Sequence, residues 1–124
     1  CAFTSAKEVF TSVLKTTYHM PAFPLMDLSD RMAKKEAGYG LDECNARDEV
    51  KKAKIPMLFI HGSKDTFVPC SMVHELYEAC AAPKDLLIIE GASHAEAYYK
   101  DRPAYEAAVR KLMERAFTKG VCEE

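Results

Sequence analysis

Two titratable side chains in this sequence each follow a short apolar run that ends at a glycine. Asp65 comes three residues after Gly62, and His94 comes three residues after Gly91. A carboxylate that accepts a hydrogen bond from imidazole Nδ1–H fixes the tautomer of the ring and stabilises the imidazolium that forms during proton transfer. Nε2 is then free to act as a general base toward a nucleophile. The pair therefore predicts the acid and the base of a catalytic triad.

Either residue taken alone also has a plain structural explanation. An aspartate three residues after a glycine is typical of a turn or a helix cap, and a histidine in the same setting is typical of an exposed loop. The two residues nevertheless occupy equivalent places, each shortly after the glycine that ends an apolar run. This repetition favours the catalytic explanation and leaves the structural one open.

The elements that must position Asp65 and His94 are two strands, predicted at about 56–61 and 86–90. The runs MLFI and LLII inside them show no alternation of polar and apolar residues, which is typical of parallel strands covered on both faces. A helix predicted over residues 71–80 separates them. In such a strand–helix–strand unit, adjacent parallel strands end at the same edge of the sheet. We therefore expect Asp65 and His94 to lie within reach of each other.

The chain before residue 55 is predicted to be mainly helical. Residues 1–20 are expected to form a helix, in which Ser5 and Glu8 have the spacing of a capping box. A second short helix is expected from about Leu25, ended by Gly38 and Gly40. Residues 41–54 are polar and charged, which predicts a surface connection with about one helical turn and with Val50 as a minor anchor.

After the second strand, Asp101 is predicted to cap a helix with Pro103 in its first turn and Gly120 after its end. The fold class is therefore α/β. Two short strands of this apolar kind require further neighbouring strands, so we expect part of a larger domain. We interpret residues 1–54 as a helical lid-like or connecting segment and residues 55–124 as a C-terminal core segment.

Two motifs in this unit resemble those of α/β-hydrolases. The sequence HGSKDTFVP at residues 61–69 is similar to the loop with the triad acid, H-G-x-x-D-x-x-V-P, and GASH at residues 91–94 is similar to the histidine loop. The resemblance is closest to bacterial esterases of the prolyl-oligopeptidase-like and serine-aminopeptidase-like kinds. It is specific over residues 55–117, and the preceding residues are similar to a partial lid. The resemblance implies that Asp65 is the triad acid and His94 the triad base.

The nucleophile of this family has no counterpart in the sequence. It occupies a G-x-S-x-G turn upstream of the acid, and no such motif occurs here. GASHA at residues 91–95 lacks the last glycine, Ser63 belongs to the acid motif, and Ser5 and Ser12 belong to a predicted helix. Because the chain also begins with Cys1 and not with Met, we expect a processed or trimmed C-terminal part of a serine hydrolase that is inactive alone.

Composition and charge argue against several other classes. The 124 residues carry 17 basic and 19 acidic side chains, a net charge of −2, so nothing favours nucleic acid or an anionic membrane as a partner. No apolar run approaches the roughly 18 residues that a membrane span needs. The five scattered cysteines favour free thiols in a reducing compartment, and we expect a cytoplasmic protein.

Neither a metal nor a cofactor is expected. Cys70 and His74 are four residues apart near the start of one predicted helix and Cys80 lies nearby, but a complete set of four ligands is not evident. Acyl transfer to serine, which the resemblance implies, requires no cofactor. His61 comes at the end of a buried strand, which favours a structural role for it.

Three functional hypotheses follow. The first is a serine hydrolase that cleaves an ester or, as a second choice, a peptide or amide, completed by a missing N-terminal half or by another copy of the chain. The second is a non-enzymatic interaction or oligomerising fragment, because unpaired strand edges bind other chains. The third is a small pseudoenzyme that folds on its own.

Overall fold

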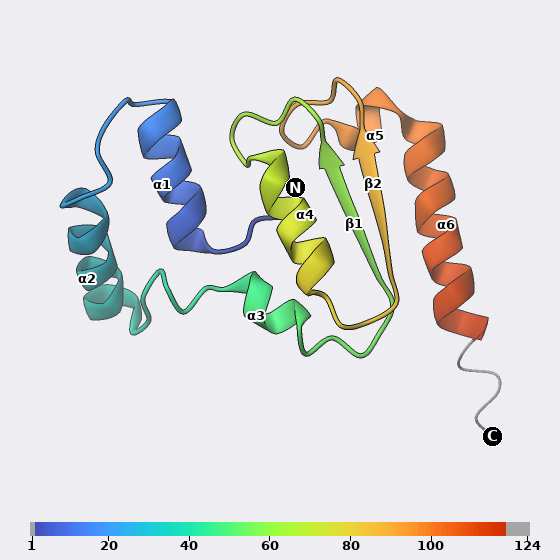
Figure 1. The fold of residues 1–124 in the computed structure, drawn as a ribbon, viewed down its shortest axis with the longest axis horizontal. Helices are drawn as coiled ribbons and strands as arrows, with labels where there is room; N and C mark the ends of the chain where they lie inside the picture. Colours follow the sequence, from blue (N-terminus) through green and yellow to red (C-terminus); the bar gives the residue numbers. More distant parts are fainter. Residues whose placement is uncertain (1, 119–124) are drawn as a thin grey trace.

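Residues 2–118 are described by the computed structural model, with six helices and two strands in this range (Figure 1). In chain order they are α1 (Ala6–Thr16), α2 (Leu25–Ala37), α3 (Ala46–Val50), β1 (Met57–Gly62), α4 (Cys70–Ala79), β2 (Lys84–Ile89), α5 (Ala97–Lys100) and α6 (Arg102–Thr118). Cys1 and residues 119–124, with the predicted role of Gly120, lie outside the described range. None of the helices within it is long and apolar enough to cross a membrane.

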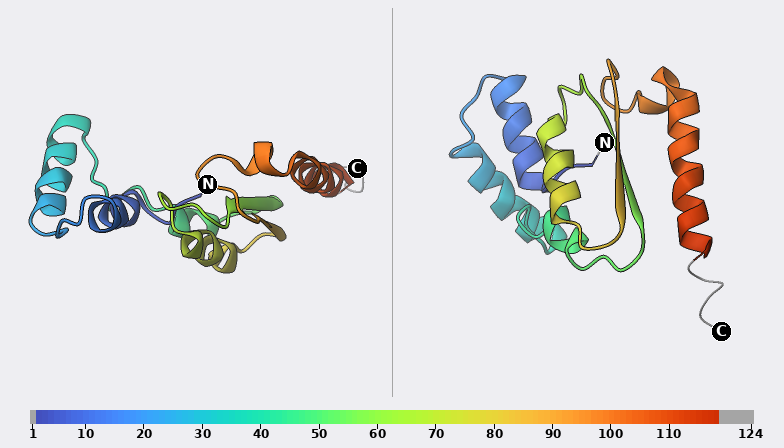
Figure 2. Two further views of the ribbon diagram at one scale, coloured as in Figure 1. Left: turned by 90° about the horizontal axis from the view of Figure 1, so that it is seen from above. Right: turned by 45° about the vertical axis from the view of Figure 1, so that its right-hand side comes forward.

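The two strands pair in parallel, which confirms the predicted α/β class. Their register places Gly62 beside Ile89, so both strands end at the same edge of the sheet. Helices α3 and α4 pack on one face, and α5 and α6 pack on the other (Figure 2). β2 begins at Lys84, two residues before the predicted strand 86–90, and it ends at Ile89.

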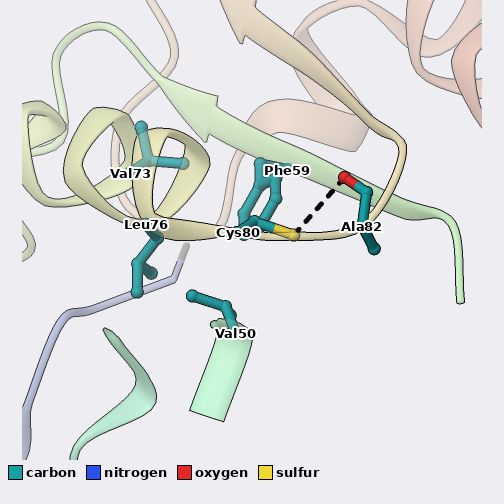
Figure 3. Close-up of a cluster of buried hydrophobic side chains, with 6 residues drawn as sticks. All are labelled: Val50, Phe59, Val73, Leu76, Cys80 and Ala82. Atoms are coloured by element: carbon teal, nitrogen blue, oxygen red, sulfur yellow. Dashed lines mark hydrogen bonds between the residues drawn. The ribbon is translucent and has the colours of Figure 1, made fainter. Parts of the chain in front are cut away.

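The larger hydrophobic core lies between the sheet and α4 (Figure 3). Its buried members are Val50, Phe59, Val73, Leu76, Cys80 and Ala82. Because successive strand residues point to opposite faces, Phe59 belongs to this core while Ile60 packs with the cluster beside α5 and α6. Val50 is only 8% exposed, so the connection that contains it is held by a core residue and not by a minor anchor.

Local signals explain where the helices begin and end. At the start of α1, Ser5 Oγ accepts from Glu8 N at 3.2 Å, so this helix is shorter than the predicted range 1–20. α2 is ended by Gly38, as predicted, and the φ of 81° at this residue is a left-handed conformation that glycine adopts without strain. Asp101 caps α6 as predicted, since its Oδ1 accepts from Ala104 N at 3.0 Å.

The N-terminal helices are joined to the rest of the fold through α1. Val9 of α1 forms a buried cluster that includes Val68. Arg47 Nη2 lies 3.0 Å from Glu8 Oε2 and 2.7 Å from Glu75 Oε2, so one guanidinium links α1 with α4. α2 lies on the far side of α1 from the sheet (Figure 1). The division into a lid-like and a core segment stays a prediction.

Candidate active site

Asp65 and His94 lie side by side at the edge where both strands end. His94 Nδ1–H donates to Asp65 Oδ2 at 2.9 Å. The two residues are carried by the loops that follow β1 and β2, which are residues 63–69, here called the acid loop, and residues 90–96, the histidine loop. The Asp65 side chain is 0% exposed and that of His94 is 44% exposed. A buried carboxylate thus orients an imidazole ring that a reactant can reach.

Backbone amides of the acid loop hold the Asp65 carboxylate in place. Oδ1 accepts from Phe67 N at 3.0 Å and from Val68 N at 2.8 Å, which is the arrangement of an aspartate-stabilised turn. These bonds replace the water that a buried carboxylate loses. Asp65 is therefore a turn aspartate through Oδ1, and its second oxygen is left to face His94.

Three hydrogen bonds join the acid loop to β2 and the histidine loop. They run from Ser63 N to Ile89 O at 3.0 Å, from Lys64 N to Ala92 O at 2.9 Å and from Gly91 N to Ser63 Oγ at 2.8 Å. The hydroxyl of Ser63 is therefore engaged in loop structure. Since the backbones of the two loops are bonded directly, the relative position of Asp65 and His94 is set by main-chain geometry.

The histidine loop has two further constraints. Glu96 Oε2 accepts from Ser93 N at 3.1 Å, so Glu96, for which the sequence predicts no role, closes the loop around His94. Ala95, directly after His94, has a φ of 61°. A non-glycine residue in this left-handed region carries backbone strain, and such strain is often found at functional sites.

Phe67 connects His94 to an apolar pocket. Its ring lies 4.9 Å from the His94 ring, centroid to centroid, with an interplanar angle of 54°. The pocket has a volume of about 440 Å³ and is lined by Phe10, Val13, Leu14, Tyr18, Leu25, Met26, Ser29, Leu41 and Phe67. All of these residues except Phe67 come from α1, α2 and the segments beside them, so the N-terminal helices supply most of the wall. The sequence pattern marks Phe67 only as a variable position of the acid motif.

His61 packs against the acid loop from β1. Its side chain is 0% exposed, and its Nε2 lies 2.9 Å from Val68 O. The same nitrogen lies 3.4 Å from Asp65 Oδ2. His61 is thus at the strand end, as predicted, and also in contact with Asp65.

Cysteine and histidine side chains outside the two loops are the other candidates for chemistry, as a nucleophile or as metal ligands. Within residues 2–118, no group of three or more His, Cys, Asp or Glu side chains is arranged to hold a metal. Burial, and to a smaller extent the negative charge of Asp65, raises the pKa of the Cys70 thiol. This shift keeps Cys70 protonated, which disfavours it as a nucleophile. His74 is exposed on α4.

Comparison with known proteins agrees with this geometry. The chain is similar to "Uncharacterized protein YqkD" of Bacillus subtilis (strain 168), with 32% identity over 114 residues, and the matched region is 92% of this chain and 37% of that protein. The chain thus spans little more than a third of the length of this relative. No solved structure matches the 124-residue chain. Residues 9–95, which include Asp65 and His94, match the family described as Serine hydrolase (FSH1). The match covers more than half of the chain, which therefore belongs to this serine hydrolase family.

Proposed function

We propose that the chain supplies the acid and the base of a Ser-His-Asp triad in an ester hydrolase. The observation that carries the proposal is the 2.9 Å hydrogen bond between His94 Nδ1 and the fully buried Asp65 carboxylate. A histidine oriented in this way has Nε2 available as a general base. Family membership supports hydrolysis through a serine, and the geometry supports Asp65 and His94 as the two assisting residues.

The proposed reaction proceeds in two acyl transfers. His94 Nε2 takes the proton of a serine hydroxyl as the serine oxygen attacks the ester carbonyl, and it then gives that proton to the departing alcohol. A water molecule attacks the resulting acyl-enzyme with the same assistance, which releases the carboxylic acid and restores the serine. Asp65 stabilises the imidazolium in both steps.

The serine of this scheme would come from polypeptide outside these 124 residues. The sequence contains no G-x-S-x-G motif, and the chain corresponds to 37% of its Bacillus relative. Ser5 Oγ and Ser63 Oγ each accept a backbone N–H, from Glu8 and Gly91, in structural roles. A strand from the same additional polypeptide would extend the two-stranded sheet.

An ester with an apolar acyl or alkyl group is the substrate class that the pocket favours. The pocket of about 440 Å³ has no charged residue in its lining, and Phe67 is shared between the pocket and the His94 ring. Such pockets bind ligands by burying apolar surface. A peptide or amide is the second substrate class.

The proposal predicts that the complete gene product hydrolyses p-nitrophenyl butyrate and that the 124-residue chain alone does not. His94→Gln should reduce kcat about 10⁶-fold, because the general base is lost. His74→Gln removes an exposed histidine on α4 and is the matched control, with unchanged kcat. Turnover by the 124-residue chain that His94→Gln abolishes would instead place the nucleophile inside it.

A second prediction concerns the pocket. Phe67→Ala in the complete gene product should lower kcat/KM for p-nitrophenyl octanoate about tenfold more than for p-nitrophenyl acetate, a difference of roughly 1.4 kcal/mol. Phe117→Ala, at an exposed position of α6, should change neither value. An equal loss for both esters would show that Phe67 acts on His94 and that the pocket does not hold the substrate chain.

Strand-completing association is a second candidate function. Within residues 2–118, β1 and β2 form a two-stranded sheet, so each strand has one edge without a neighbouring strand. Such edges pair readily with strands of another chain. Light scattering of the 124-residue chain would then show dimers or larger assemblies, and a stable monomer at high concentration would argue against this candidate.

A further inference from the structure

Two imidazole rings approach the same carboxylate oxygen at this site. His94 Nδ1 lies 2.9 Å from Asp65 Oδ2, and His61 Nε2 lies 3.4 Å from the same atom. The side chains of His61 and Asp65 are both 0% exposed. The proposed proton transfers use His94 alone, so the second, fully buried histidine has no part in them.

The hydrogen bonds determine which nitrogen of His61 carries a proton. Val68 O lies 2.9 Å from Nε2, and a carbonyl oxygen only accepts, so Nε2–H must be the donor. The same nitrogen lies 3.4 Å from Asp65 Oδ2. His61 Nδ1 is buried and has no hydrogen-bond partner among residues 2–118. The ring therefore acts on the acid loop through Nε2 alone.

This N–H holds the acid loop through the main chain of Val68. Val68 N donates to Asp65 Oδ1 at 2.8 Å, and Val68 O accepts from His61 Nε2–H at 2.9 Å. The Asp65 carboxylate is thereby tied to the ring of His61 through Val68, while its Oδ2 binds His94 Nδ1 at 2.9 Å. Without the His61 donor, the buried carbonyl of Val68 has no hydrogen-bond partner. Because an unpaired buried carbonyl is costly in free energy, the acid loop is expected to rearrange.

We propose that His61 is a positioning residue of the triad, which keeps Asp65 Oδ2 directed at His94 Nδ1 because its Nε2–H holds the Val68 main chain that binds Oδ1. The inference rests on the proposed function and extends it to a residue that neither touches substrate nor transfers a proton. Because only one N–H is used, a different side chain of similar reach with a terminal N–H should replace the imidazole.

The test compares two substitutions in the complete gene product labelled with ¹⁵N-histidine. His61→Leu removes the donor, and His61→Gln keeps one. NMR should show the hydrogen-bonded Nδ1–H proton of His94 in the wild-type protein and in His61→Gln, but not in His61→Leu. For p-nitrophenyl butyrate, His61→Leu should lower kcat about 10²-fold with KM unchanged, as expected for a misplaced catalytic group. His61→Gln should keep most of the wild-type kcat.

A stability control separates positioning from general loosening of the fold. Val73→Ala creates a cavity at a 0% exposed position of α4, away from the two loops, and should lower Tm while leaving the His94 signal and kcat unchanged. If His61→Leu behaves like Val73→Ala, with a lower Tm and nothing else, the positioning role is wrong.

A measurement on the wild-type protein decides the matter even if His61→Leu does not fold. Correlation of the ring nitrogens with the ring protons should show His61 protonated at Nε2, and a proton on Nδ1 with Nε2 bare would overturn the proposal. The NMR readouts require no turnover. An inactive protein with the expected His61 and His94 signals would therefore refute the hydrolase and leave the positioning of Asp65 standing.

Discussion

Asp65→Asn is expected to lower kcat/KM for ester hydrolysis by the complete gene product about 10⁴-fold, with the fold preserved. The Asn oxygen can still accept from Phe67 N and Val68 N, so the turn should remain. The amide then presents NH₂ to His94 Nδ1, which now lies 2.9 Å from a carboxylate oxygen. His94 must turn or adopt the other tautomer, with its proton on Nε2, where it can no longer accept the proton of a nucleophile.

Steady-state kinetics and thermal unfolding together check this expectation. Asp42→Asn is the matched control, because Asp42 is an exposed carboxylate whose partner is Lys7 on α1, at 2.9 Å. The control should retain activity within twofold. A tenfold loss or less for Asp65→Asn, in a protein that is folded, would mean that this aspartate is only a turn residue and that the base is oriented by another group.

Gly62→Ala is expected to destabilise the protein by about 3 kcal/mol, the upper end of the usual range for overpacking. A Cβ at this position would lie 2.3 Å from Ala92 O and 2.9 Å from Ser93 O, and both atoms belong to the backbone of the histidine loop. No side-chain rotation relieves such contacts. The loops must therefore separate, which should also disrupt the hydrogen bond from Lys64 N to Ala92 O and displace His94 from Asp65.

Urea denaturation of the variants measures this effect. Gly38→Ala is the matched control, because Gly38 has a φ of 81° but a methyl group added there would meet no described atom within 4 Å. It should lose only the roughly 1 kcal/mol of left-handed backbone strain and keep its activity. If the two substitutions lower the free energy of unfolding equally, the loops can move apart at Gly62 without loss of stability, and the expectation is wrong.

The pairing of Asp65 with His94 is the part of the site that local sequence signals predict well. An unbroken apolar run followed by a glycine indicates a buried strand and its end, and both signals are contained within a few residues. Once two such strands are parallel neighbours, the register that places Gly62 beside Ile89 brings the loops together. The same reasoning predicts the order of the main elements, with errors at their ends, as at Lys84 and in α1.

The partners that surround this pair are much harder to predict, because they depend on contacts between segments far apart in the chain. Nothing near Phe67 in the sequence indicates that its ring meets His94 or completes a pocket formed by α1 and α2. Nothing near Val50 indicates that it enters the core beside Phe59. These contacts arise from the packing of whole helices against the sheet, which no local pattern encodes.

By itself, then, the sequence determined the fold class, the two strand ends and the two residues proposed as acid and base, because hydrophobic runs and glycine turns act locally. Only the tertiary structure decided how the carboxylate of Asp65 is held. Its Oδ1 binds two backbone amides and its Oδ2 binds His94, with the buried ring of His61 3.4 Å from Oδ2. That arrangement depends on the distance between two loops bonded across the end of the sheet. Such distances follow from strand register and close packing, and they become fixed only when the chain folds.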